Sequence, residues 1–217
     1  IMKIESIHVE HSDKFYENKY LKELVDIALE NYNNDFFDDI LGFIMMGNEN
    51  LSTLFKKKHN ANEDLVNSIL SLITNIFNDN QCDSLRGAFL ELLIFNFLDK
   101  KYSIKDNYSD IDINCFVKID DKKSEKTVDV FAHCINKGFI CEAKLKHINF
   151  TGEHIANLKK IFILSDNILS PYIITLADRR TICNKLKNIV QEDYSNSWVN
   201  LDDINIVSID ELNSFFS

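Results

Sequence analysis

Apolar positions change their spacing near the middle of the chain. Before residue 100 they recur at intervals of three and four, which is typical of amphipathic helices. This spacing predicts helices over residues 15–32, 35–46, 62–77 and 83–100, with Asn62 and Asp83 as the N-caps of the last two. The first eighty residues are therefore expected to be helical.

Beyond residue 109 the apolar period becomes two. Residues 110–119 alternate between apolar and polar side chains, which predicts a strand. Two further strands, 127–135 and 139–145, are separated by Asn136, Lys137 and Gly138, a spacing typical of a β-hairpin. The remaining pattern predicts a helix at 152–161, a strand at 172–176, a helix at 178–190, a strand at 204–209 and a short helix at 210–216.

This order of elements predicts an α/β fold with a mixed central sheet flanked by helices. Residues 1–80 are expected to form an acidic, α-helical N-terminal subdomain, and residues 81–217 the domain that contains the sheet.

The formal net charge of −10 argues against a general nucleic-acid binder, but the charge is unevenly distributed. Residues 1–80 hold seven Lys against fourteen Asp and Glu, a balance of −7. Residues 143–190 hold eight Lys and Arg against three acids, a balance of +5. A local basic field matters more to a phosphate backbone than the total charge does.

No apolar run approaches the roughly 20 residues of a membrane span, and no basic-then-apolar leader is present. The five cysteines include no C-x-x-C pair, so buried thiols in a reducing cytosol are expected instead of disulfides or a zinc site. The sequence predicts a cytoplasmic protein with no membrane partner.

Three charged residues interrupt the apolar runs of the predicted hairpin: Asp129, Glu142 and Lys144. Glu142 and Lys144 point to one face of their strand. An even-length turn puts Asp129 opposite Lys144 and diagonal to Glu142, within reach of a shared ion. Two carboxylates beside an ammonium suit phosphodiester hydrolysis, because the carboxylates hold Mg²⁺ or Mn²⁺ and the lysine stabilises developing negative charge or orients the attacking water.

Asp129 followed after a strand–turn–strand by Glu142-Ala143-Lys144 resembles the "PD-(D/E)xK" motif of the restriction-endonuclease-like nuclease superfamily. The resemblance covers about residues 83–190. Val128 stands where the motif has its proline, and many members of the superfamily also lack that proline.

The resemblance implies a restriction-endonuclease-like core and a Mg²⁺-dependent (or Mn²⁺-dependent) nuclease. It implies that Asp129 and Glu142 ligate the metal, that the carbonyl of Ala143 contributes, and that Glu91 on the preceding helix completes the site. Glu91, Asp129, Glu142 and Lys144 are thus the expected catalytic residues. The alternative for the hairpin is an ordinary cross-strand salt bridge, and for Glu91 a solvated helix position.

Four polar residues follow the motif and are candidates for contact with the substrate. His154, Asn157 and Lys160 recur at helical spacing, and Lys146 directly follows the strand. Members of the resembled superfamily often carry polar residues here that support the site or contact phosphate. An ordinary polar helix face remains the alternative.

These observations favour a cytoplasmic endonuclease that acts on DNA more readily than on RNA. The acidic helices are expected to bind a protein partner or a second copy of the chain that controls activity. A role in anti-phage defence or restriction is the corresponding biological hypothesis. Two alternatives stay open: an inactive interaction or immunity protein on a nuclease fold, which the acidic charge favours, and an RNA nuclease that cuts tRNA.

Overall fold

The computed structural model describes residues 2–10, 13–46, 51–102, 110–134, 136–192 and 201–217. The chain divides into two compact units, a helical unit at Ser12–Leu93 and a sheet unit formed by Ile1–His11 and Ile94–Ser217. The N-terminal segment belongs to the sheet unit because β1 (Ile4–His8) pairs with β2 (Asp110–Ile119). The expectation that the first eighty residues are helical is therefore wrong for this segment.

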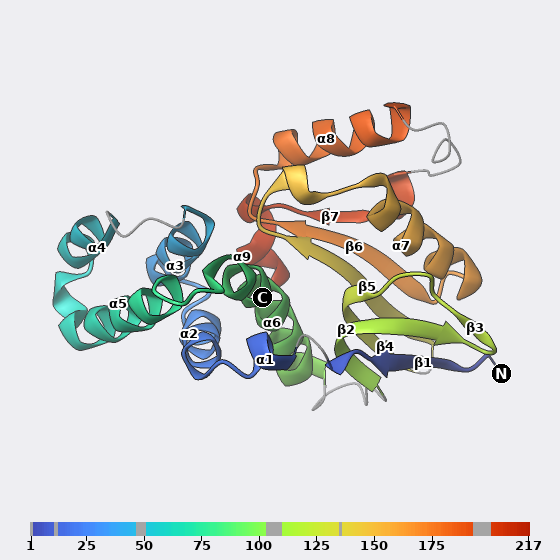
Figure 1. Cartoon of the computed structure of the whole chain (residues 1–217). Helices are drawn as coiled ribbons and strands as arrows, with labels where there is room; N and C mark the ends of the chain where they lie inside the picture. The colour runs from blue at the N-terminus through green and yellow to red at the C-terminus, as the bar shows by residue number, and fades with distance from the viewer. Residues whose placement is uncertain (1, 11–12, 47–50, 103–109, 135, 193–200) are drawn as a thin grey trace. The chain divides into compact units, whose positions relative to one another are not determined.

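The sheet unit contains one mixed sheet, as the sequence predicted (Figure 1). Among the described residues its strands follow the order β1-β2-β4-β5-β6-β7, with β3 paired to β2. The pairs from β1 to β5 are antiparallel, and the β5–β6 and β6–β7 pairs are parallel. The strands not yet given are β3 (Lys122–Lys123), β4 (Val128–Cys134), β5 (Lys137–Lys144), β6 (Leu169–Thr175) and β7 (Asn205–Val207).

Two long helices connect the parallel strands. Helix α7 (Gly152–Leu164) joins β5 to β6, and α8 (Arg179–Glu192) follows β6. Parallel neighbours need such a crossover, because a tight turn reverses the chain. The apolar sides of both helices share one core cluster with the sheet, which includes Phe131, Ile140 and Ile173 of the three central strands. The short helix α9 (Leu212–Phe215) ends the described chain.

The helical unit holds α1 (Asp13–Tyr16), α2 (Lys19–Glu30), α3 (Asp35–Met46), α4 (Ser52–Lys58) and α5 (Glu63–Phe77). Helix α6 (Cys82–Tyr102) begins in this unit and ends in the sheet unit. The predicted helix over 15–32 is divided, because the side chain of Asn18 accepts the N–H groups of Tyr20 and Leu21 and starts α2 there. Asp83 lies in the first turn of α6 and does not precede it.

Several predicted elements are confirmed with small changes. Strand β2 and helix α3 have the predicted bounds, and the hairpin β4–β5 is present. Strand β6 begins before Pro171, where the prediction had placed that proline outside the strand. Strand β1 and helix α4 are additional to the prediction.

None of the helices in the described ranges is long and apolar enough to cross a membrane. None of the five cysteines, all of which the structure describes, forms a disulfide, and Cys115, Cys134 and Cys141 are buried. The predicted absence of a disulfide framework agrees with this arrangement of the five residues.

Candidate active site

The β4–β5 hairpin brings the motif residues together with a register that differs from the prediction. Val130 pairs with Cys141, and the ladder runs to Cys134 opposite Lys137. Continued by one step, this register sets Asp129 opposite Glu142 and diagonal to Lys144. The prediction that Asp129 lies opposite Lys144 is wrong, because pairing already begins at Lys137 and shortens the turn. The three side chains nevertheless share one face.

The side chain of Asp129 continues the pairing of β4 with β5 at the end away from the turn. Its Oδ2 accepts the backbone N–H of Ala143 at 2.7 Å, directly beyond the last Val130–Cys141 pair. The carboxylate thus takes the place of a backbone acceptor where β4 turns away from β5. This contact holds the carboxylate beside the C-terminal end of β5.

Next to Asp129, the alternation of side chains between the two faces of the sheet is interrupted in both β2 and β4. Val128 and Phe131 belong to the same core cluster, although a regular strand places residues three apart on opposite faces. On β2, Ile113 pairs with Val130 and Cys115 with Val128, so Asn114 lies across from Asp129. Asn114 has a φ of 47°, a left-handed conformation that asparagine adopts more readily than most residues. The left-handed backbone of Asn114 thus lies across from Asp129, where the alternation of both strands is interrupted.

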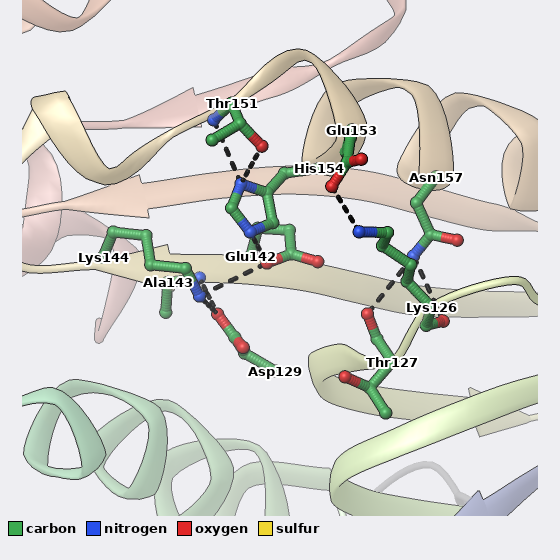
Figure 2. Close-up of polar contacts among 10 residues, drawn as sticks. All are labelled: Lys126, Thr127, Asp129, Glu142, Ala143, Lys144, Thr151, Glu153, His154 and Asn157. Atoms are coloured by element: carbon green, nitrogen blue, oxygen red, sulfur yellow. Dashed lines mark hydrogen bonds and ion pairs between the residues drawn. The ribbon is translucent and has the colours of Figure 1, made fainter. Parts of the chain in front are cut away.

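Both motif carboxylates converge on the ammonium of Lys144 (Figure 2). Lys144 Nζ donates to Asp129 Oδ2 and lies 3.3 Å from Glu142 Oε2. The side chain of Glu142 is only 3% exposed, so its charge depends on nearby cations. Two carboxylates and one ammonium leave the group with a formal charge of −1.

His154 approaches the same group from the first turn of α7. Its Nδ1 accepts the backbone N–H of Thr151 at 3.1 Å in a capping box. Because that N–H can only donate, the ring proton lies on Nε2, which is 4.0 Å from Glu142 Oε2. Burial, and then the charge of Lys144, lowers the pKa of His154. A neutral imidazole with a fixed tautomer therefore faces the motif carboxylate.

The polar side of α7 is tied to the segment that leads into β4. Asn157 is buried, and its Nδ2 donates to the carbonyls of Lys126 and Thr127 at 3.3 and 3.2 Å. Lys160 pairs with Glu125 at 2.9 Å. Glu153 pairs with Lys126 (Figure 2). These contacts join α7 to the segment before the strand of Asp129, and contact of Asn157 and Lys160 with substrate stays a prediction.

The two other predicted site residues are Lys146 and Glu91. Lys146 is an exposed residue just after β5. Glu91 belongs to the helical unit, where it lies on α6 and accepts a hydrogen bond from the Tyr16 hydroxyl. Its part in the site stays a prediction.

The donor set fits a hard divalent cation. Two carboxylates, together with the carbonyl of Ala143 between Glu142 and Lys144, offer the oxygen ligands that Mg²⁺ and Mn²⁺ prefer. Within the described ranges, no three His, Cys, Asp or Glu side chains are grouped closely enough to hold an ion. An ion here would therefore retain several waters, as Mg²⁺ usually does.

Sequence reasoning missed two residues that shape the site. Thr151 is signalled by its spacing, since Thr followed three residues later by a side-chain acceptor is the pattern of a capping box. Asn114 gives no such signal, because it occupies a polar position of an otherwise regular alternation. Its left-handed backbone emerges only when β2 and β4 pair.

No protein-family model and no curated protein sequence matches the chain. Among solved structures, it is similar to protein VC1899 from Vibrio cholerae, with 15% identity and a TM-score of 0.46 over 99% of this chain and 57% of that one. It is also similar to Can2 from Sulfobacillus thermosulfidooxidans in complex with cyclic tetra-adenylate, with 11% identity and a TM-score of 0.48 over 97% of this chain and 54% of that one. The chain spans just over half the length of each, and similarity at this level carries no argument about function.

Proposed function

We propose that this chain is a metal-dependent nuclease that hydrolyses phosphodiester bonds, and that double-stranded DNA is its substrate. The convergence of Asp129 and Glu142 on Lys144 at the end of β5 is the observation that supports it. A salt bridge needs one carboxylate for one lysine, and here a second, almost buried carboxylate faces the same ammonium.

Each residue of the group has a place in hydrolysis. Asp129 and Glu142, with the Ala143 carbonyl, would hold Mg²⁺ or Mn²⁺, which supplies positive charge to the scissile phosphate. Lys144 donates a hydrogen bond to a phosphate oxygen and stabilises the charge that develops there. His154, whose Nε2 lies 4.0 Å from Glu142 Oε2, would favour one orientation of this carboxylate by electrostatic attraction.

The proposal includes control of the nuclease activity by a partner that binds the helical unit. The helical unit, Ser12–Leu93, holds seven Lys and Arg against fourteen Asp and Glu, so its balance of −7 is acidic although α4 ends in three lysines. An acidic unit repels a phosphate backbone, which favours a protein partner or a second copy of the chain on its surface. Restrained nucleases of this kind suit anti-phage defence, and that is the biological role we propose.

A cleavage assay tests the activity. Plasmid and linear duplex DNA, single-stranded DNA and tRNA are incubated with Mg²⁺, Mn²⁺ or EDTA. Lys144→Ala is expected to abolish cutting. Lys118→Ala is the matched control, because Lys118 also pairs with a cross-strand carboxylate, Glu5 at 2.8 Å, on the same sheet but on strands β1 and β2.

Metal-dependent cutting of duplex DNA that Lys144→Ala removes and Lys118→Ala retains is the expected result. Cutting of tRNA alone would show that RNA is the substrate instead of duplex DNA, and would still support metal-dependent phosphodiester hydrolysis. Folded wild-type protein that cuts nothing with either metal, alone or with a co-purified partner, would contradict the nuclease and favour an interaction protein.

A further inference from the structure

An isoleucine is exposed at the end of the strand that carries the motif. Ile148 lies in a 3₁₀ turn, His147–Asn149, that follows β5 and precedes α7. Its residue surface is 62% exposed, whereas Phe150, two positions later, is 1% exposed. Scattered exposed apolar residues are common, so its surroundings decide whether this one has a role.

The turn holds Ile148 in a defined position. The N–H of Asn149 donates to the carbonyl of Lys146 at 3.1 Å, and that of Phe150 to the carbonyl of His147 at 3.3 Å. Phe150 anchors the turn in the core cluster, which it shares with Ile155 of α7 and Ile182 of α8. Ile148 is therefore held outward on an ordered backbone close to Lys144 in sequence.

Basic residues lie on the two segments that adjoin this turn. Lys146 precedes the turn and is exposed. Helix α8 contacts the turn (Figure 1). It carries Arg180 and Lys187, which are exposed. None of these three cations forms an ion pair within the part of the chain that the structure describes. Other lysines on the neighbouring helix are engaged, since Lys159 pairs with Asp203 and Lys160 with Glu125. Lys146, Arg180 and Lys187 are thus available to a phosphate backbone.

We infer that Ile148 inserts between base pairs of duplex DNA beside the phosphate that the motif cleaves, while Lys146 and Arg180 contact the flanking phosphates. This inference rests on the proposed function and names how its substrate is bound. Apolar side chains between cations are used in this way by proteins that open a base step and bend the duplex. An isoleucine alone among cations is also poorly suited to a protein interface, whose centre is apolar and depleted of charge.

Binding and unstacking are measured separately from cleavage. A duplex with 2-aminopurine at several adenines reports unstacking as a rise in fluorescence, and fluorescence anisotropy of a labelled duplex reports affinity. Lys144→Ala protein is used with Mg²⁺ so that the duplex stays intact. Ile148→Ala is compared with Ile163→Ala, because Ile163 is 55% exposed at the opposite end of α7 from His154.

Ile148→Ala is expected to raise the Kd for duplex DNA about tenfold, as the loss of most of a buried aliphatic side chain implies, and to remove the 2-aminopurine signal. Ile148→Phe should retain the signal, and Ile163→Ala should behave as the parent. Arg180→Ala should weaken binding and reduce the slope of log affinity against log salt by about one, as the loss of one phosphate contact does.

The outcomes separate this inference from the proposed function. Cleavage by otherwise wild-type protein with Ile148→Ala at unchanged KM, or binding without any 2-aminopurine signal, would overturn the insertion and leave the nuclease standing. Binding with an Ile148-dependent signal, but no cleavage by wild type, would overturn the nuclease and support the insertion. Protein that neither binds nor cuts duplex DNA would overturn both.

Discussion

The carboxylate of Asp129 accepts the backbone N–H of Ala143 at 2.7 Å, so one side chain both completes the hairpin and carries a motif charge. The same Oδ2 also accepts from Lys144 Nζ. Structural and chemical roles of Asp129 are therefore separable by substitution, because an amide oxygen replaces the acceptor but not the charge.

Asp129→Asn should keep the free energy of unfolding near that of wild type and lower cleavage about a hundredfold or more, since a metal ligand and its charge are lost. Asp129→Ala should lose the acceptor as well and unfold with about 1–3 kcal/mol less free energy, because the Ala143 N–H is left without its partner. Urea denaturation and single-turnover cleavage check the two quantities. Equal destabilisation by both variants would contradict the acceptor role.

Asn114 should tolerate glycine and resist β-branched residues. Its φ of 47° costs an ordinary L-residue about 1–2 kcal/mol, and valine more than most. We expect Asn114→Gly to fold and cut normally. Asn114→Val should lose both stability and cleavage per folded molecule, because it disturbs the backbone of β2 across from Asp129. Asn167, with φ 64° in the connection from α7 to β6, is the matched control.

Asn167→Val should lose similar stability and retain cleavage per folded molecule. Urea midpoints, and cleavage rates divided by the folded fraction measured by circular dichroism, check both pairs. If the two valine variants lose activity equally, Asn114 has no special relation to the site.

Strand β2 was predictable because its apolar and polar residues alternate, and β4 and β5 were predictable because they are short apolar runs separated by turn residues. The hairpin register was not, because residues on both sides of Asn136 are compatible with a longer turn. A shift of two residues keeps every side chain on its face, so the apolar pattern does not distinguish Asp129 opposite Lys144 from Asp129 opposite Glu142.

Strand β1 escaped prediction for a related reason. Ile4–His8 is a short polar-rich segment whose pairing with β2 depends on partners more than a hundred residues away. Ser6 donates both its N–H and its hydroxyl to the Asp110 carboxylate, at 2.7 and 3.0 Å. Side-chain contacts of such long range fix the strand and leave no local periodicity.

Thiol reactivity tests the burial of the cysteines. Burial raises the pKa of Cys115, so the thiolate that reacts with disulfide reagents is scarce at neutral pH. Cys134 and Cys141 are buried as well, whereas Cys82 and Cys183 are partly exposed. Ellman's reagent at pH 8 should titrate no more than two of the five thiols in native protein and all five in urea. Rapid native titration of a third thiol would contradict the described core.

His154 links the start of α7 to Glu142, and its two contacts can be tested apart. Glutamine preserves an acceptor for the Thr151 N–H, so His154→Gln should unfold within about 0.5 kcal/mol of wild type. Alanine removes the acceptor and should cost about 1 kcal/mol, as loss of a helix cap does. Both variants remove the imidazole that faces Glu142 and should lower kcat together.

Thr151→Ala is the control for His154, because it removes the other half of the capping box and leaves the imidazole in place. It should lose stability as His154→Ala does and keep kcat within about twofold, a small loss compared with that of a site residue. Urea unfolding and steady-state rates give both values. Unchanged kcat in His154→Gln would assign His154 to the helix cap alone, and the orientation of Glu142 would then rest on Lys144.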